Sequence, residues 1–202
     1  AAELAEMLGP EVLAWGCRLE NHVARDAASH VYLGVTPRGI PAWVDRRYVE
    51  ADLKILTGLI EPHLMAGYSG GRKAICPGLC AVETVMAWHS PAMLAPAEAC
   101  AGNLWRNPVH EEALAVADLA GGADFILNTV LDEHRRVTGV YCGDLRTAHL
   151  QGMRQAERQA KVVLPEPVDI VITSAAGYPL DLTFYQGIKG MVAALPILKP
   201  GG

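Results

Sequence analysis

The pattern of apolar and polar positions predicts strands and helices that alternate along the chain. Short apolar or β-branched runs predict strands, and longer runs with one apolar face predict helices. The expected strands are residues 11–18, 31–35, 40–44, 51–59, 125–131, 136–141 and 168–173. The expected helices are residues 1–8, 79–88, 108–119, 145–162 and about 182–195. Since several of these strands lack a polar face, the alternation indicates an α/β fold.

The strongest candidate for a domain boundary is the run Leu164-Pro165-Glu166-Pro167. Two prolines there separate a long predicted helix from a new strand–turn–helix unit. We therefore expect residues 1–165 to belong to one domain and residues 166–202 to begin another. The sequence opens in what reads as a helix already under way and closes on a turn, so we expect an internal piece of a longer protein.

The composition of the 202 residues is that of a well-filled globular protein, with 51% hydrophobic and only 19% charged residues. This excludes a disordered tail, a fibrous repeat and a nucleic-acid-binding arm. The formal net charge of −5 predicts no attraction to phosphate backbones or anionic lipid. The longest apolar stretches, such as residues 191–198, are shorter than the roughly 20 residues that span a bilayer. We expect a cytoplasmic protein without nucleic-acid or membrane partners.

The five cysteines are an odd number, and we expect reduced thiols rather than a disulfide framework. Cys76 and Cys80 have three residues between them instead of the two of a zinc knuckle, and no second pair follows. A structural zinc site is therefore not expected. A non-catalytic metal-binding module that uses these two cysteines stays open as an alternative.

Candidate chemistry is densest in residues 61–73, which read EPHLMAGYSGGRK. Closely spaced glycines let a backbone approach a ligand, and this loop has His63 before it and Lys73 at its end. A further histidine, His89, closes the predicted helix of residues 79–88. We expect His63, Lys73 and His89 to converge on one cavity, with the glycine loop in its wall.

Two other functions of a glycine-rich loop need comparison with this sequence, and one of them is excluded. A phosphate-binding P-loop fails, because Arg72 stands where the second glycine is needed and Ala74 replaces the serine or threonine that binds magnesium. A Schiff base between Lys73 and a pyridoxal-type cofactor, in a lyase or transferase, remains an alternative, because a desolvated lysine is nucleophilic.

Two segments together resemble the lactate racemase family. The first is the run of residues 61–73 with Cys76-Pro77-Gly78 and His89 after it, and the second is residues 175–190, AAGYPLDLTFYQGIKG. The resemblance implies an isomerase that inverts the α-carbon of a 2-hydroxy acid by hydride transfer to a nickel-pincer nucleotide. It implies two α/β domains with the active site in the cleft between them. Residues 1–165 would be part of the N-terminal cofactor-bearing domain, and residues 166–202 the start of the C-terminal domain.

The resemblance also implies a role for each matching residue. Lys73 would carry the nickel-pincer nucleotide through a thioamide, and His89 would ligate nickel, a metal that imidazole suits. His63 would be one of two histidines that act as acid and base on the substrate hydroxyl, and Lys189 would also be catalytic. Three residues would contact the substrate: Tyr185, Gln186 and Lys189. Their spacing of three and four positions independently places them on one helix flank, where a lysine suits a carboxylate.

The resemblance leaves half of the catalytic machinery unmatched. The second catalytic histidine and the residues that bind the cofactor phosphate should precede Ala1, and neither His22 nor His30 lies in a matching motif. We therefore expect residues 1–202 alone to be inactive. The expected partners are a small 2-hydroxy acid and the proteins that synthesise the cofactor. The sequence does not select among lactate, malate, aromatic hydroxyacids and sugar acids.

Overall fold

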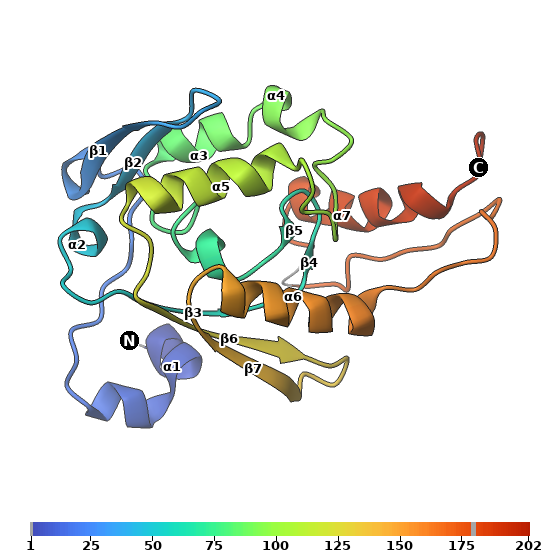
Figure 1. Cartoon of the computed structure of the whole chain (residues 1–202). Coiled ribbons are helices and arrows are strands. Elements are labelled where there is room, and N and C mark those ends of the chain that lie inside the picture. The colour runs from blue at the N-terminus through green and yellow to red at the C-terminus, as the bar shows by residue number, and fades with distance from the viewer. Residues whose placement is uncertain (1, 179–180) are drawn as a thin grey trace.

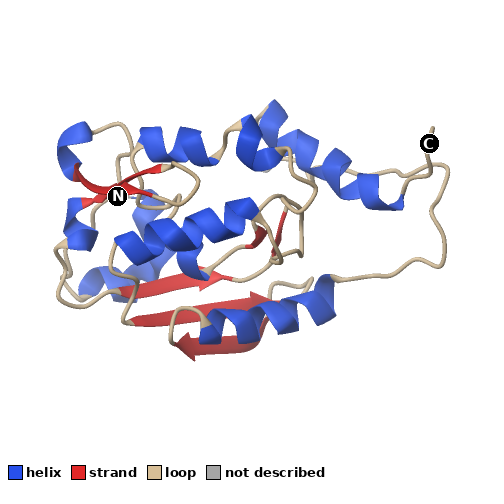
Figure 2. Ribbon diagram, turned by 45° about the horizontal axis from the view of Figure 1, so that its top comes forward, coloured by secondary structure: helices blue, strands red, loops and turns tan. Residues whose placement is uncertain are grey.

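The computed structural model describes residues 2–178 and 181–202. Its largest sheet has three strands in the order β3 (Ile55–Leu59), β6 (Phe125–Leu131) and β7 (Val137–Gly143). Strand β3 runs parallel to β6, and β7 pairs with β6 in the antiparallel direction. Helix α6 (Thr147–Ala160) packs against β6 and β7. Figure 2 shows this sheet at one side of the molecule rather than at its centre.

Two small hairpins complete the strand structure of the described residues. Strands β1 (His30–Val35) and β2 (Pro41–Asp45) are antiparallel, and α3 (Val82–Trp88) packs on β2. Strands β4 (Pro62–His63) and β5 (Gly67–Tyr68) form the second hairpin. The remaining α-helices, labelled in Figure 1, are α1 (Ala2–Ala14), α2 (Arg46–Val49), α4 (Pro91–Leu94), α5 (Pro108–Leu119) and α7 (Phe184–Ala194). The 3-10 turns are η1 (Ala27–Ser29), η2 (Gly71–Ala74) and η3 (Leu195–Ile197).

The core has two clusters of buried side chains. The larger one joins the β1–β2 hairpin, α3, α5 and the inner face of the sheet, and its largest fully buried side chain is that of Trp88. The smaller cluster lies between the β4–β5 hairpin, β6 and α6, and consists of Ile60, Tyr68, Val130, Met153 and Ala156. The β4–β5 hairpin is thus anchored on the sheet through Tyr68.

The α/β fold class predicted from the sequence is confirmed. Helix α5 begins and ends where expected, because Asn107 accepts hydrogen bonds from the backbone N–H groups of Val109 and His110, and Pro108 occupies the first turn. Strand β6 also matches its prediction, and β1, β2, β7, α3, α6 and α7 differ from theirs by a few residues at their ends. No helix in the described part of the chain has the length and apolar character needed to cross a membrane.

The predicted strand at residues 11–18 is wrong. Helix α1 continues to Ala14 across a kink at Gly9, whose φ of 79° and ψ of 155° are not helical. Pro10 follows the kink, and proline is well tolerated in the first turn of a helix. The chain therefore starts a second helical segment where a strand was expected. The predicted start of the first helix, Ala1, lies outside the described residues.

The prediction of a buried strand at residues 51–59 is correct only in part. The strand begins at Ile55, after the short helix α2, and Leu56 is its one buried residue. The outer face of the sheet is open, so that Ile55, Leu127 and Val140 are about half exposed. A strand with apolar residues on both faces can therefore still have one face exposed to solvent.

The predicted strand at residues 168–173 is also wrong. Val168 makes an isolated parallel bridge with Leu198, but the residues that follow have no strand partner among those described. Ile170 is 79% exposed and Ile172 is 96% exposed. A β-strand exists only where a neighbour satisfies its backbone N–H and C=O groups, and β-branched composition cannot supply that neighbour.

Candidate functional site

His63 is the last residue of β4, and the hairpin fixes the hydrogen bonding of its ring. His63 pairs with Gly67 across the hairpin, and its Nδ1 accepts the backbone N–H of Ala66 at 3.2 Å. Because Nδ1 is an acceptor in this bond, the neutral imidazole carries its proton on Nε2. The only basic lone pair of the neutral ring is therefore the one covered by Ala66.

The surroundings of His63 keep its ring neutral. Burial lowers the pKa of His63 to about 3, and the charges of four further groups act in the same direction: Lys73, Lys189, Arg72 and His89. Three of the sequence-predicted residues thus lie close enough to affect one imidazole, although they come from η2, α7 and the end of α3. In Figure 1, α7 lies beside the β4–β5 hairpin that carries His63.

The glycine loop leads directly into the turn that carries Lys73. Gly71 has a φ of 51°, in the left-handed region, and its backbone N–H donates to Oδ1 of the fully buried Asn128 at 2.8 Å. The backbone N–H of Lys73 donates to the carbonyl of Gly70 at 3.1 Å, which closes the turn η2. The glycines therefore allow a tight reversal that fixes Lys73 above the sheet.

The pKa of the Lys73 amine lies close to neutral pH. Burial lowers the pKa of Lys73 to about 8, with further lowering by the charges of Arg72 and Lys189, while Cys76 and Glu61 oppose the shift. Lys73 makes no ion pair within residues 2–178 and 181–202. An amine with a lowered pKa is a better nucleophile at neutral pH, so this lysine is suited to a covalent attachment.

His89 is the C-terminal cap residue of α3, and its ring is held in one orientation. Its Nδ1–H donates to the carbonyl of Val85 at 2.8 Å, and its ring meets that of the buried Trp88 edge-on at 4.7 Å. A backbone carbonyl that fixes Nδ1–H leaves the Nε2 lone pair free, which is the usual arrangement for a metal-binding histidine. The described residues hold no group of three or more His, Cys, Asp or Glu that could bind a metal. A metal on His89 would need further ligands from outside this set of residues.

Helix α7 presents the other predicted residues. Thr183 caps its N-terminus by accepting the backbone N–H of Gln186, and Nζ of Lys189 lies 5.6 Å from the centroid of the Tyr185 ring. Gln186 and Lys189 are half-buried, and Tyr185 is half exposed. The charge of Lys189 acts on both His63 and Lys73, so α7 shares the electrostatic environment of the glycine loop.

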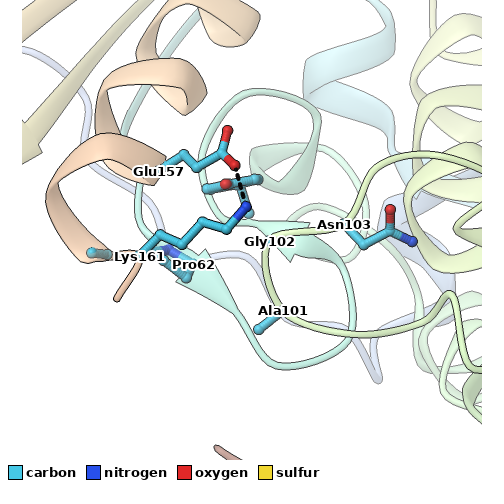
Figure 3. A pocket seen from close by; sticks show the side chains of 8 residues that line it. Pro62, Ala101, Gly102, Asn103, Glu157 and Lys161 are labelled. Atoms are coloured by element: carbon cyan, nitrogen blue, oxygen red, sulfur yellow. Dashed lines mark hydrogen bonds and ion pairs between the residues drawn. The ribbon is translucent and has the colours of Figure 1, made fainter. Parts of the chain in front are cut away.

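A hollow of about 420 Å³ lies next to the β4–β5 hairpin (Figure 3). Its lining residues are Pro62, Tyr68, Ala101, Gly102, Asn103, Glu157, Ala160 and Lys161. Glu157 and Lys161 form an ion pair of 2.9 Å on its rim. His63, Lys73 and His89 are not among these lining residues, so this hollow is not the cavity on which they were expected to converge.

His22, His30 and the buried cysteines have structural roles in this chain. His22 lies 3.0 Å from a carboxylate oxygen of Asp45 and 3.0 Å from the carbonyl of Cys80, which ties the end of β2 to the start of α3. His30 is buried against the His22 ring. Cys76 and Cys80 are free thiols, both fully buried. The pKa of Cys76 is raised by the neighbouring Cys80 thiol and by burial, which disfavours the thiolate that binds metals.

The sequence interpretation missed three buried polar residues behind the glycine loop. Arg72, Asn128 and His149 are at most 3% exposed, and the ring of His149 lies against Gly71. Arg72 was visible in the sequence only as a departure from a P-loop. A charged residue beside two glycines reads as solvated, and the signal that it is buried lies in its contacts with distant segments.

The α/β fold carries a glycine-rich turn with Lys73 in it, and the charges of Lys73, Lys189 and His89 act on the buried ring of His63. Residues 1–101 match the family model of the lactate racemase N-terminal domain, and residues 163–202 match that of the lactate racemase C-terminal domain. The chain belongs to the lactate racemase family.

Relatives of this chain include two proteins named lactate racemase. The one from Lactiplantibacillus plantarum is 40% identical and the one from Thermoanaerobacterium thermosaccharolyticum 39% identical, each over 181 residues. Each match covers 90% of this chain but only 42% of the relative. This chain thus spans less than half the length of the curated relatives it matches.

Solved structures show the same relationship. The lactate racemase apoprotein from Thermoanaerobacterium thermosaccharolyticum matches with a TM-score of 0.93 and 36% identity, over 100% of this chain and 48% of that one. A Thermotoga maritima protein matches with a TM-score of 0.61 and 21% identity, over 74% of this chain and 41% of that one. At that identity the second match speaks for the fold alone.

Proposed function

We propose that this chain forms part of a racemase that inverts the α-carbon of a 2-hydroxy acid such as lactate. The observation that carries the proposal is the grouping of Lys73, Lys189 and His89 around the neutral imidazole of His63. The relatives' names support lactate, or an acid like it, as the substrate. A racemase of this kind is an isomerase, because substrate and product differ only in configuration.

The residues of this chain fit a nickel-pincer nucleotide. Lys73 would hold it covalently through its amine, whose pKa of about 8 leaves a useful neutral fraction. His89 would ligate the nickel through Nε2, since its Nδ1–H is already bound to Val85. When bound, the cofactor would supply a reversible acceptor for the hydrogen on the α-carbon. The proteins that synthesise this cofactor would then be partners of the whole enzyme.

His63 would move the proton of the substrate hydroxyl. Its basic lone pair is on Nδ1, which the N–H of Ala66 covers. The substrate hydroxyl would therefore displace the N–H of Ala66 and donate its proton to Nδ1. The low pKa of His63 ensures that the ring is neutral before the substrate arrives, and the proton returns to the oxygen in the reverse step.

Helix α7 would orient the substrate. Lys189 would pair with the carboxylate of the 2-hydroxy acid, and we place it with His63 in the catalytic group because its charge reaches that ring. Tyr185, which lies beside Lys189 on the helix, and Gln186 would complete the substrate contacts. A racemase needs a second acid/base on the opposite face of the substrate. Since His22 and His30 are engaged elsewhere, we propose that this group lies outside the chain described.

The test is the nickel content of three variants of the full-length parent, made together with the cofactor-synthesis proteins. His89→Ala should lose most of its nickel, His63→Ala should keep nickel and cofactor, and Lys73→Ala should lose the covalent mass increment. The rate of His63→Ala should still fall by about 10²–10⁴-fold, as for a lost general acid/base. His134→Ala, at an exposed histidine, is the matched control.

Three results would contradict the proposal. A reversed pattern, with nickel lost from His63→Ala and kept by His89→Ala, would exchange the two histidine roles. Retention of nickel and activity by both variants would refute the site altogether. A visible absorption that disappears on borohydride treatment would instead favour the Schiff-base lyase or transferase that Lys73 could also serve.

A further inference from the structure

Arg72 is a buried cation without an acidic partner. Its side chain is fully buried, and no carboxylate in the described part of the chain lies within ion-pair distance of it. Its Nη2 donates to the carbonyl of Ala66 at 2.6 Å, while its Nε–H has no acceptor. Burying an unpaired charge is costly, and a buried charge is weak evidence for stability. Core stability therefore does not explain why an arginine is buried at this position.

The contacts of Arg72 lead to two of the proposed functional residues. Ala66, whose carbonyl Arg72 binds, is the residue whose N–H covers Nδ1 of His63. Arg72 also directly precedes Lys73 within the turn η2. One guanidinium is thus connected to His63 through a single residue and to Lys73 through a single peptide bond.

The side chain of Arg72 packs against His149. The Nε2–H of His149 donates to the carbonyl of Ser69 at 2.7 Å, and Nη1 of Arg72 lies 3.5 Å from the same nitrogen. The ring of His149 also lies against Gly71. With Ala66 on one side and His149 on the other, the guanidinium has little freedom to turn away from the loop.

We propose that Arg72 is a positioning residue: in the substrate-free chain it holds Ala66 over the lone pair of His63, and it sets the charge environment of Lys73. This inference rests on the proposed function for the roles of His63 and Lys73. After burial, the charge of Arg72 is the largest cause that lowers the pKa of Lys73, and for His63 it follows burial, Lys73 and Lys189. The other charged groups that act on Lys73 are Lys189, which adds to the lowering, and Cys76 and Glu61, which oppose it.

Two substitutions separate the hydrogen bond from the charge. Arg72→Lys keeps a positive charge but loses the planar guanidinium group. Only that group can bind the carbonyl of Ala66 and pack against His149 at the same time. Arg72→Met has similar bulk and no charge. Arg146→Lys, at an exposed arginine paired with Asp118, is the matched control. An amide NMR spectrum of each variant shows whether it is folded.

The measurements use the full-length parent without metal or cofactor. The first is the ¹⁵N chemical shift of the two ring nitrogens of His63. The second is the pH dependence of acetylation of Lys73 by acetic anhydride, read by peptide mass spectrometry with Lys161 as internal reference. Neither depends on racemase activity, so a failure of the proposed function and a failure of this inference are distinguishable.

We expect both variants to change the Nδ1 shift of His63. Arg72→Met should also raise the pKa of Lys73 and so reduce its acetylation rate near pH 8. The reduction should be up to about tenfold, which is the effect of a rise of one pKa unit. Arg72→Lys should leave that rate within about twofold of the unsubstituted chain. Wild-type His63 shifts and an unchanged Lys73 profile in the folded variants would overturn the proposal. Should Arg72→Met fail to fold, an unchanged Nδ1 shift in Arg72→Lys would overturn it alone.

Discussion

The backbone of Gly71 rests directly on the imidazole ring of His149. A Cβ atom on Gly71 would stand 2.7 Å from both Cγ and Nδ1 of that ring, which is closer than real Cβ contacts. Gly71 also has a φ of 51°, a conformation that residues with a Cβ rarely adopt. The glycine is therefore required by both space and backbone conformation.

Gly71→Ala should destabilise the chain by about 2 kcal/mol, because it combines an unfavourable backbone conformation with overpacking against His149. The measurement is the urea midpoint of unfolding, followed by circular dichroism. Gly187→Ala is the matched control, since a Cβ at that position in α7 meets nothing within 4 Å. We expect the control to be neutral or slightly stabilising, and equal midpoints for the two variants would contradict the close contact.

Acid should destabilise the chain as the pH falls below about 6.5. Burial, followed by the charge of Arg72, lowers the pKa of His149 from 6.5 to about 4, and the same two causes lower that of His110 to about 3. As the pH falls, the unfolded chain therefore binds protons at these histidines before the folded chain does. The stability that the neutral histidines contribute is fully present above pH 6.5 and is lost as the pH falls toward their pKa in the folded state. Each pH unit in this window costs about 1.4 kcal/mol per histidine.

Urea midpoints between pH 7.5 and 4.5 test this dependence. His149→Gln keeps a possible donor to Ser69 but cannot titrate, so its stability should change less steeply with pH. His134→Gln, at an exposed histidine, should retain the full slope. A slope that is the same in His149→Gln as in the unsubstituted chain would show that the His149 ring is not the group that titrates.

The proposed contact between Lys189 and the substrate carboxylate predicts a specific kinetic change. In the full-length parent, Lys189→Gln should lower kcat/KM for lactate by about ten- to a hundredfold, the equivalent of a lost charge-assisted hydrogen bond. Lys189→Arg should recover part of it. Lys199→Gln, where the lysine pairs with the exposed Asp169, should behave as the parent does. A Lys189→Gln enzyme with unchanged kinetics would remove the residue from the catalytic group.

The 202-residue chain should not racemise lactate even when cofactor is supplied. In the proposed function His63 serves one face of the substrate, while His22 and His30 are held by hydrogen bonds at or near the β1–β2 hairpin. The assay is polarimetry or chiral chromatography of lactate incubated with the chain and cofactor. Turnover would show that a second acid/base lies within these residues, and His22→Ala and His30→Ala would then identify it.

The sequence predicted those elements whose signals are local. Asn107 and Pro108 mark the start of α5, and the β-branched runs of β1 and β6 are bounded by turns, so short-range chemistry sufficed. Residues 169–173 belong to a run of the same composition but have no paired neighbour among the described residues, and composition does not reveal pairing. Gly9 shows the opposite case, since a kink that looked like an end is only a bend.

The sequence supplied candidate site residues but not their arrangement. The glycine loop and its flanking residues formed a recognisable run, and the helix around Lys189 was expected from spacing. The proximity of Lys189 to His63, the Val85 carbonyl that fixes His89, and the burial of Arg72 are tertiary facts. Each depends on segments far apart in the sequence.

The segment of residues 168–173, which has no strand partner among the described residues after Val168, affects how the isolated chain behaves at high concentration. It reads VDIVIT, carries one charge and no proline, and holds Ile172 almost entirely in solvent. Such a six-residue segment has the composition from which intermolecular β-sheets and aggregates grow. The chain therefore exposes an aggregation-prone segment. Stocks for crystallisation or spectroscopy are best kept dilute and cold.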